Sequence, residues 1–486
     1  MAIFLGIDLG AGALKAQLID ADAQPIAAAR CEIATHHPAH GHAEQNPADW
    51  RAAMLDALKQ LKHDRPKEFA AIAAVSISGG AHIAVLCDDK ATPLRPAIMW
   101  SDTRAADEAA AMRADPRTEA IAGNRPQPTW TLPQLVWLAA HEPDVISATK
   151  RFYFAKDWLR ALLTGDRHTD RTEAAGSLMA DARTGAWDAE LVAQCGLDLS
   201  CLPTLADSQE IVGTTTQTSG LKAGIPVVQG AIDTSLEFLC CAPLDAQTAS
   251  LKLASAGVIS CGTDTPAPQP PVSFYPHILP DAWYHAAGMS ACTGALDWMR
   301  TQFFDNCDYA ALEALAQTAT RGANGVLFHP YLEGARAPHW DTKLTADLSG
   351  LTHATTRADI ARAAYEGIGF AFLDIWRHME TCLNAPMPKH LHLLGGGAHS
   401  PFWAQMLADM LNADISVGQH NDASFAGALL AGYGAGAFAS LAEAARAGYH
   451  EAARFTPDKA AHTHYSECHA NYDARRIGLQ EGQTDD

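Results

Sequence analysis

Basic residues are scarce in this sequence. Its 35 Lys and Arg residues face 55 Asp and Glu residues, which gives a formal net charge of −20 over 486 residues. A surface of this sign repels the phosphates of nucleic acids and the headgroups of anionic lipids. We therefore expect neither a nucleic acid nor a membrane surface as a partner.

Aromatic and charged residues are modest in number, at 7% and 19%, beside 48% hydrophobic residues. This composition is typical of globular proteins, and it excludes a disordered chain, collagen and a coiled coil. At roughly 100 to 200 residues per domain, the length predicts two or three domains.

The sequence lacks a disulfide pattern and a targeting signal. Its eleven cysteines are an odd number, none belongs to a C-x-x-C pair, and Cys240 directly precedes Cys241. Such a distribution favours a reducing compartment. The first residues, MAIFLGID, reach an acid at position 8 without a basic residue before it, which predicts a first strand and not a signal peptide. We expect a cytoplasmic protein.

No stretch is hydrophobic enough to predict a membrane span. The longest uncharged stretch near the C-terminus, residues 423–442, consists mostly of Ala and Gly, whose transfer into lipid gains little free energy. It predicts instead a buried, closely packed helix, in which Gly432 and Gly436 let a neighbouring element approach.

Familiar nucleotide fingerprints are absent as well. There is no G-x-x-x-x-G-K-[ST] loop, and no G-x-G-x-x-G follows the first strand. What the sequence has are turns of small residues directly after predicted strands, at 10–13, 254–257 and 395–398. Such turns let backbone N–H groups approach a phosphate closely, although each alone is equally typical of a plain connection.

The pattern of strands and helices predicts two similar α/β domains. Predicted strands at 3–9, 14–20 and 25–35 form a β-meander, which a helix from Pro47 and a strand at 72–78 follow. A second β-rich opening lies near residue 255, with one strand at 251–261, another at 391–394, and a helix at 402–411 that Ser400 caps. We place the boundary near residue 245, which divides the chain into 1–245 and 246–486.

Two acids stand at strand ends. Asp8 ends the first predicted strand, and Asp233 follows the predicted strand at 224–229 just before the apolar stretch 236–244. A carboxylate in such a place either caps a turn, holds a metal ion or accepts a proton. Local sequence leaves these alternatives open.

Six segments together resemble the FGGY carbohydrate kinase family, most closely its bacterial xylulokinases, and they follow one another in the family's order. They are DLGAGALK at 8–15, SGGAH at 78–82, RPAIMWSDTR at 95–104, QGAID at 229–233, ASAG at 254–257, and GGGAHSPFW at 395–403 followed by Ala408 and Asp409.

This resemblance implies two ribonuclease-H-like domains of the actin and sugar kinase type with a cleft between them, ATP and Mg²⁺ as cofactors, and a small sugar as substrate. Asp233 would be the catalytic base and Asp8 would hold Mg²⁺ through water. The other implied contacts are Ala81, His82, Asp102 and Asp233 for the sugar, and Gly10, Ala11, Gly12, Ser255, Ala256, Gly257, Gly396 and Gly397 for ATP. A homodimer is left open.

The sequence departs from the family at these turns. Ala11, Gly12 and Ala13 stand where the family usually carries hydroxyl side chains, and Gly80 and Ala81 replace Gln and Met, which leaves a roomier sugar pocket. The first hypothesis is phosphorylation of D-xylulose to its 5-phosphate. The alternatives are a sister enzyme for another ketose, polyol or sugar acid, and a sugar- or nucleotide-binding sensor that has lost catalysis.

The histidines of the loop at 36–42 could bind a metal ion. They lie in a polar loop that contains Pro38 and Gly41, which does not predict a helix that could present them together on one face. We expect this loop to be scaffold.

Overall fold

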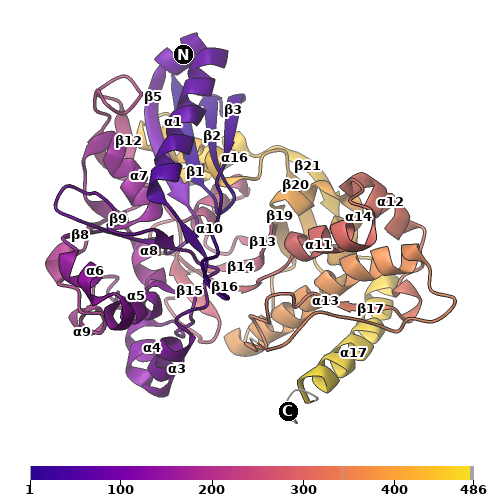
Figure 1. Cartoon of the computed structure of the whole chain (residues 1–486). Helices are drawn as coiled ribbons and strands as arrows, with labels where there is room; N and C mark the ends of the chain where they lie inside the picture. Colours follow the sequence, from indigo (N-terminus) through magenta and orange to yellow (C-terminus); the bar gives the residue numbers. More distant parts are fainter. Residues whose placement is uncertain (1, 342, 482–486) are drawn as a thin grey trace. The chain divides into compact units, whose positions relative to one another are not determined.

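A computed structural model describes residues 2–341 and 343–481 (Figure 1). The chain forms two compact units. The first unit consists of Met1–Ala246, Gly262–Tyr284 and His420–Tyr449, and the second consists of Gln247–Cys261, His285–Gln419 and His450–Asp486. The predicted division into 1–245 and 246–486 remains a prediction about domains. The first unit, as the contacts define it, also takes in two later segments.

The first unit is built on a six-stranded sheet of order β11-β12-β5-β1-β2-β3. Strands β1, β2 and β3 form an antiparallel meander, β5 runs parallel to β1, and β12 runs parallel to β5. These strands are β1 (Ile3–Leu9), β2 (Ala13–Asp20), β3 (Pro25–Glu32), β5 (Ile72–Gly79), β11 (Ile211–Thr214) and β12 (Pro226–Val228). The predicted meander is therefore present, and all seven residues of β1 are buried.

The second sheet has the order β15-β16-β14-β13-β19-β20-β21, and its core repeats the first order. Strand β14 is antiparallel to β13, whereas β19 and β20 continue in parallel on the other side. These strands are β13 (Ala249–Leu253), β14 (Gly257–Thr263), β15 (Ser273–Pro276), β16 (Trp283–Met289), β19 (His390–Leu394), β20 (Asp414–Gly418) and β21 (Glu451–Phe455). The single strand expected at 251–261 is two strands, because a turn closed by Ala254 N–H and the Ala256 carbonyl (3.1 Å) separates them.

Short strands and many helices complete the units. The short strands are β4 (Glu44–Gln45), β6 (Ala84–Cys87), β7 (Ala97–Ile98), β8 (Arg151–Phe154), β9 (His168–Asp170), β10 (Thr204–Ala206), β17 (Leu327–His329) and β18 (Asp347–Ser349). The α-helices are α1 (Pro47–Asp64), α2 (Pro66–Ala70), α3 (Ala106–Ala114), α4 (Pro116–Ala122), α5 (Thr131–His141), α6 (Pro143–Ala148), α7 (Ala155–Thr164), α8 (Arg171–Gly176), α9 (Ala189–Ala193), α10 (Asp233–Leu236), α11 (Thr293–Phe303), α12 (Tyr309–Gln317), α13 (Arg357–Leu383), α14 (Pro401–Leu411), α15 (Ala423–Gly434), α16 (Leu441–Gly448) and α17 (Lys459–Glu481).

Helix α1 shows how the sequence sets a local element. Asn46 caps it by accepting a hydrogen bond from the N–H of Ala48, and Pro47 occupies the first turn, where its missing N–H costs nothing. Trp50, Met54 and Leu58 recur at helical spacing and are buried against the first sheet. Capping and periodicity thus agree on this helix.

Helix α15 is the buried helix predicted from residues 423–442, and it packs on β1 of the first unit. A Cβ atom at Gly6 would collide with backbone atoms of Ser424 and Ala428, so only glycine permits this contact. Gly432 packs against Phe4, so it lets a neighbouring element approach, as expected. The expectation for Gly436 is wrong: it lies beyond the helix at φ +80°, and a Cβ there would meet nothing within 4 Å.

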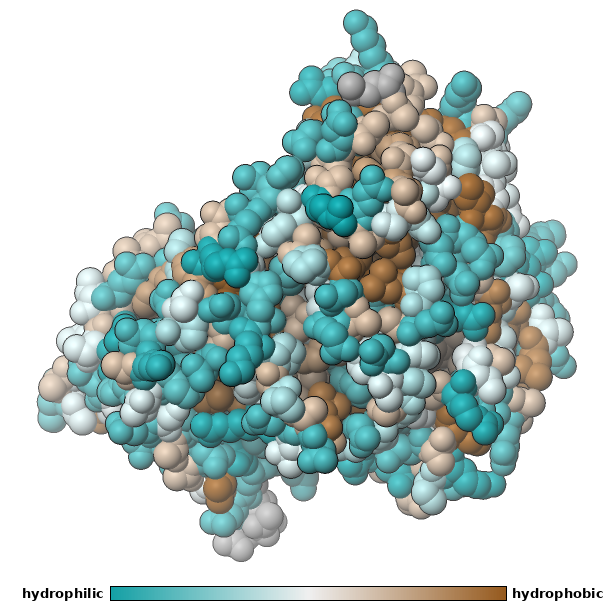
Figure 2. Space-filling view, turned by 180° about the vertical axis from the view of Figure 1, so that it is seen from behind, coloured by the Kyte–Doolittle hydropathy of each residue, from teal (hydrophilic) through white to brown (hydrophobic). Residues whose placement is uncertain are grey.

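Within the described residues, no helix is both long and apolar enough to cross a membrane. The face drawn in Figure 2 is mostly hydrophilic and carries its hydrophobic residues in small separate patches.

Candidate active site

The first sheet brings the two acids to the same edge. Asp8 is the register partner of Ser78 on β5, and Gly79 at the end of β5 forms a parallel bridge with Ile232, the residue before Asp233. The carboxyl ends of neighbouring parallel strands are the usual ligand-binding edge of an α/β sheet. Asp8 and Asp233 therefore flank the end of β5 on its two sides.

Asp8 is 8% exposed and lies at the end of β1. The Ser78 hydroxyl donates a hydrogen bond to its Oδ1 (2.7 Å). Its antiparallel partner is Lys15, whose ammonium lies 3.6 Å from a carboxylate oxygen of Asp422. The chain turns into a hairpin after Asp8, so this carboxylate caps no helix.

The turn after β1 is held by its own backbone. The Gly10 N–H donates to the Ala13 carbonyl (3.0 Å), the Gly12 carbonyl accepts from Ile33 N–H (3.0 Å), and Gln45 Nε2 donates to the Ala11 carbonyl (2.6 Å). Gly12 is exposed, and a Cβ there would meet nothing within 4 Å. The turn therefore has room for a ligand at Gly12.

Asp233 begins α10 and is partly exposed. Its Oδ1 accepts hydrogen bonds from the Thr234 N–H (2.7 Å) and the Thr234 hydroxyl (3.2 Å). The preceding residue is anchored from another element, because Ile232 N–H donates to the Thr172 hydroxyl of α8 (3.1 Å). The side chain of Asp233 thus stands on a backbone that α8 holds in place.

His82 follows β5 and is 7% exposed, with a left-handed backbone at φ +64°. Its ring contacts those of Trp130 (centroids 5.4 Å apart) and Tyr275 (5.6 Å), which also stack on each other (6.0 Å). Burial lowers the pKa of His82 to about 3, against the attraction of the carboxylates of Asp170 and Asp233. The imidazole is therefore neutral at physiological pH.

Asp102 is completely buried. One of its oxygens accepts from Ala43 N–H (2.5 Å), and the Arg104 guanidinium binds both of its oxygens (2.8 to 3.0 Å). Arg104 also pairs with Glu44 on β4 (2.8 Å). Asp102 therefore ties the loop at 95–104 to neighbouring segments, and its contact with a sugar remains a prediction, as does that of the half-buried Ala81.

The loop at 36–42 behaves as scaffold in the described residues, among which no group of His, Cys, Asp and Glu is arranged to hold a metal ion. His36 exchanges two backbone hydrogen bonds with Glu44 (2.8 Å each), which fastens the loop to β4.

The second sheet supplies a turn against the start of a helix. The Ser255 carbonyl accepts from the N–H groups of Cys292 (2.7 Å) and Gly294 (3.2 Å), and the Ala254 carbonyl accepts from Thr293 (2.9 Å). Helix α11 starts at Thr293, so its N-terminus, where anions bind favourably, adjoins the turn at 254–256. Ser255 itself is exposed.

The turn at 395–397 stands at the same edge of this sheet. Strand β19, which ends at Leu394, is parallel to β13, with Leu394 opposite Lys252. Gly396 is exposed, and a Cβ there would meet nothing within 4 Å. Ser400 then caps α14 by accepting from Trp403 N–H (3.0 Å), as predicted.

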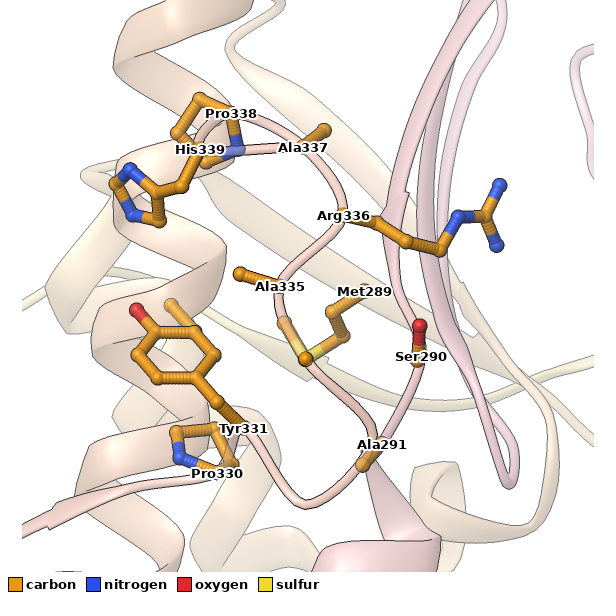
Figure 3. A pocket seen from close by; sticks show the side chains of 12 residues that line it. Met289, Ser290, Ala291, Pro330, Tyr331, Ala335, Arg336, Ala337, Pro338 and His339 are labelled. Atoms are coloured by element: carbon orange, nitrogen blue, oxygen red, sulfur yellow. The ribbon is translucent and has the colours of Figure 1, made fainter. Parts of the chain in front are cut away.

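A separate pocket of the second unit lies between the ends of β16 and β17 and helix α13 (Figure 3). His339 lines it and reaches Asp374 (3.3 Å), while the Arg336 side chain points away from its centre. None of the residues predicted for sugar or ATP lines this pocket.

Sequence reasoning missed several residues of the site. Trp130 and Tyr275 contact His82 from distant segments, and no motif marks either of them. The start of α11 was also missed, although the small residues at 288–294 (GMSACTG) are a signal of the same kind as the predicted turns.

The two units have the same strand order. The first carries acids at its strand ends and the second carries small-residue turns. These features define a two-domain phosphotransferase of the actin and sugar kinase type. Residues 3–240 match the N-terminal domain, and residues 255–435 the C-terminal domain, of the FGGY family of carbohydrate kinases. The chain belongs to this family and is a carbohydrate kinase.

Individual relatives agree. The chain is 32% identical over 415 residues to the xylulose kinase of Escherichia coli, with 84% of each chain covered, and 30% identical over 469 residues to that of Bacillus subtilis, with 94% and 93% covered. The solved structure of a xylulose kinase from Rhodospirillum rubrum is similar with a TM-score of 0.87, 26% identity and 99% of both chains covered.

Proposed function

We propose that the protein transfers the γ-phosphoryl group of ATP to D-xylulose and forms D-xylulose 5-phosphate. The observation that carries this proposal is the meeting of Asp8, His82 and Asp233 around the end of β5. The similarity to several xylulose kinases supports the choice of sugar.

Asp233 is the proposed general base, which accepts the proton of the attacking sugar hydroxyl. Phosphoryl transfer passes through a loose, charge-dispersed transition state, so the protein mainly positions and neutralises. The Thr234 N–H and hydroxyl orient the carboxylate through Oδ1, and α8 steadies the backbone through Ile232. General-base help of this kind contributes about 10²- to 10⁴-fold in rate.

The residues present fit ATP and Mg²⁺. Asp8 offers the carboxylate oxygens that Mg²⁺ prefers and would hold the ion through water. The exposed Ser255 of the turn at 254–256 offers a hydroxyl to phosphate groups, and the open surface at Gly396 suits a flat base. Bound Mg²⁺ would neutralise phosphate charge in the transition state.

The sugar site is proposed around His82. Its neutral ring offers one hydrogen-bond acceptor and one donor, which suits hydroxyl groups. Gly80 is half-buried, and a Cβ there would lie 3.8 Å from Trp100, an ordinary contact distance, so position 80 has room for a small side chain. This space is the specific reason to keep a larger ketose, a polyol or a sugar acid as the second candidate.

The test is a coupled ADP-release assay with a panel of ketoses, polyols and sugar acids. We expect the highest kcat/KM for D-xylulose, and little ADP without sugar. A higher kcat/KM for another compound would replace the proposed substrate. If no compound of the panel causes ADP release while calorimetry shows that ATP binds, the sugar- or nucleotide-binding sensor would be favoured.

A further inference from the structure

His82 is seated by helix α8. A Cβ atom at Gly176, the last residue of α8, would overlap the His82 imidazole, so this glycine lets the ring lie directly on the helix. The Thr131 hydroxyl donates to the His82 carbonyl (2.5 Å) and holds its backbone in the left-handed region. The ring therefore has one fixed place.

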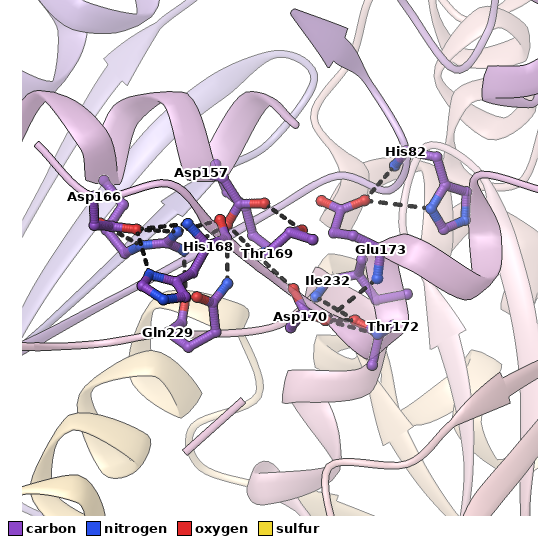
Figure 4. A network of polar contacts seen from close by, with 12 residues as sticks. His82, Asp157, Asp166, His168, Thr169, Asp170, Thr172, Glu173, Gln229 and Ile232 are labelled. Carbon is purple, nitrogen blue, oxygen red and sulfur yellow. Dashed lines mark hydrogen bonds and ion pairs between the residues drawn. The ribbon is translucent and has the colours of Figure 1, made fainter. Parts of the chain in front are cut away.

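Glu173, one turn earlier on α8, contacts His82 twice (Figure 4). Its Oε2 accepts from the His82 N–H (2.9 Å) and lies 3.3 Å from Nδ1 of the ring. On the far side of the ring, Nε2 lies 3.2 Å from the Tyr275 hydroxyl. Glu173 is 1% exposed, so this contact is closed to water.

Helix α8 is itself anchored by a buried ionic cluster. Lys156 Nζ lies 2.7 Å from Asp157 and 2.5 Å from Asp170, the N-cap of α8, and Arg160 pairs with Asp157 (2.5 Å) and Asp166 (2.9 Å). Breaking such a buried cluster is costly, so it resists displacement. Asp170 also accepts from the Thr172 hydroxyl, the group that holds Ile232 beside Asp233.

The protonation of Glu173 follows from its surroundings. The two cations of the cluster already face three carboxylates, which leaves no cation to balance a fourth. Burial raises the pKa of Glu173 well above its usual value, and the carboxylates of Asp170 and Asp157 raise it further against the effect of Lys156. The balance of these effects favours the protonated form of Glu173.

The hydrogen bonds of Glu173 settle the tautomer of His82. Oε2 accepts the backbone N–H of His82, so it is an acceptor, and Nδ1 must carry a proton to approach it favourably. Nε2 then bears a lone pair, to which the Tyr275 hydroxyl donates. The ring thus turns an acceptor, not a donor, toward Tyr275.

We propose that Glu173 is a positioning residue of the sugar site, which holds His82 in the Nδ1–H tautomer, so that Nε2 keeps the lone pair that the Tyr275 hydroxyl occupies in this structure and that a hydroxyl of the sugar takes in its place. This rests on the proposed function, because it assigns His82 to the sugar. It adds a residue that acts through His82 and does not itself touch the substrate.

The kinetic test compares Glu173→Ala with Glu173→Gln in the full-length enzyme, with Glu190→Ala as the control for removing an exposed acid. Gln keeps a carbonyl acceptor for the His82 N–H without charge, as the neutral acid does. We expect Glu173→Ala to raise the KM for D-xylulose about tenfold or more with the KM for ATP unchanged, and Glu173→Gln to restore the sugar KM to within about threefold.

Equal losses in both variants would overturn the proposal, since they would show that a negative carboxylate is needed. An unaltered sugar KM in Glu173→Ala would overturn it too. If the alanine variant does not fold, ¹⁵N NMR of histidine-labelled wild-type protein decides: we expect Nδ1 protonated and Nε2 unprotonated in His82 from pH 6 to 8. A proton on Nε2, or titration in this range, would contradict the proposal. This readout needs no sugar, so it is independent of the substrate assignment.

Discussion

The two sheets each place an acid shortly after their last parallel strand, and the two acids are used differently. Asp422 follows β20 and caps α15: its Oδ1 accepts from the N–H groups of Ser424 (2.9 Å) and Phe425 (3.2 Å). Asp233 follows β12 but lies inside the first turn of α10, where its Oδ1 accepts hydrogen bonds from the N–H and the hydroxyl of the adjacent Thr234. Asp422 and Asp233 thus follow corresponding strands of their sheets, whereas their hydrogen bonds differ.

The contrast extends to charge. Burial alone would raise the pKa of Asp422, but Lys15 and the capping bonds outweigh it and hold the pKa below its usual value. At the second-to-last residue of the central strand, the first sheet carries Asp8 and the second carries Lys252. The two sheets therefore carry opposite charges at the same position of the strand.

The largest effect expected from this comparison is at Asp233. Asp233→Asn should lower kcat at least about 10²-fold with sugar and ATP still bound, because the shape is kept and the proton acceptor is lost. Asp422→Asn is the matched control, with kcat close to wild type. Steady-state kinetics of both variants test this, and equal losses would remove the distinction between the two acids.

Asp8→Asn should come next, with kcat reduced about tenfold or more and a higher Mg²⁺ concentration needed for half-maximal turnover, since a carboxylate oxygen is lost as a ligand. The measurement is a Mg²⁺ titration of kcat beside thermal denaturation. A variant that unfolds at a much lower temperature with normal Mg²⁺ dependence would assign Asp8 to stability instead.

Filling the space beside His82 should have a smaller effect. Ala81→Met should sharpen selection among ketopentoses by about 1–3 kcal/mol, the usual worth of a fitted apolar contact. The readout is the ratio of kcat/KM values over the sugar panel. Unchanged ratios would show that residue 81 does not line the sugar site.

The units should also respond to pH in opposite directions. Burial raises the pKa of Glu173 in the folded first unit above its ordinary value of 4.5. Ionising Glu173 therefore costs more free energy in the folded chain than in the unfolded one, so its contribution to the free energy of unfolding should fall as the pH rises above 4.5. Urea unfolding should show this fall in wild type relative to Glu173→Gln, by at most about 1.4 kcal/mol per pH unit.

In the second unit, stability should depend on pH in the acidic range. Burial would raise the pKa of Asp374, but the hydrogen bonds of His339 and His469 outweigh it and lower the pKa to about 2. This carboxylate stabilises the fold above its unfolded pKa of 3.8, and the stabilisation is lost as the pH falls toward 2. In urea unfolding, an Asp374→Asn variant should therefore have a lower free energy of unfolding than wild type at pH 7, and the difference should be much smaller at pH 2.5.

Much of the frame could be read from local sequence. Alternating apolar residues marked the strands of the first meander, Asn46 and Ser400 marked helix starts, and the small-residue turns marked both strand-end turns of the second sheet. The single strand predicted at 251–261 is wrong, because the small-residue turn that the sequence marks at 254–257 divides it into two strands.

The surroundings of His82 could not be predicted in this way. Tyr275 contacts its ring from 193 residues away, and Glu173 from 91. No motif in the sequence around either residue points to His82. Such pairs depend on which elements pack together, and no local periodicity records that.

The sequence by itself determined the elements, their order and the presence of acids at strand ends, because these depend on hydrophobic spacing and turn chemistry within a few residues. The tertiary structure alone decided the uses of those acids. Asp422 and Asp233 look alike in sequence, and only the hydrogen bonds of the folded chain make the first a helix cap and leave the second beside His82. Burial does the same for Glu173, since the protonated form of an acid is favoured when packing removes water and places other carboxylates around it.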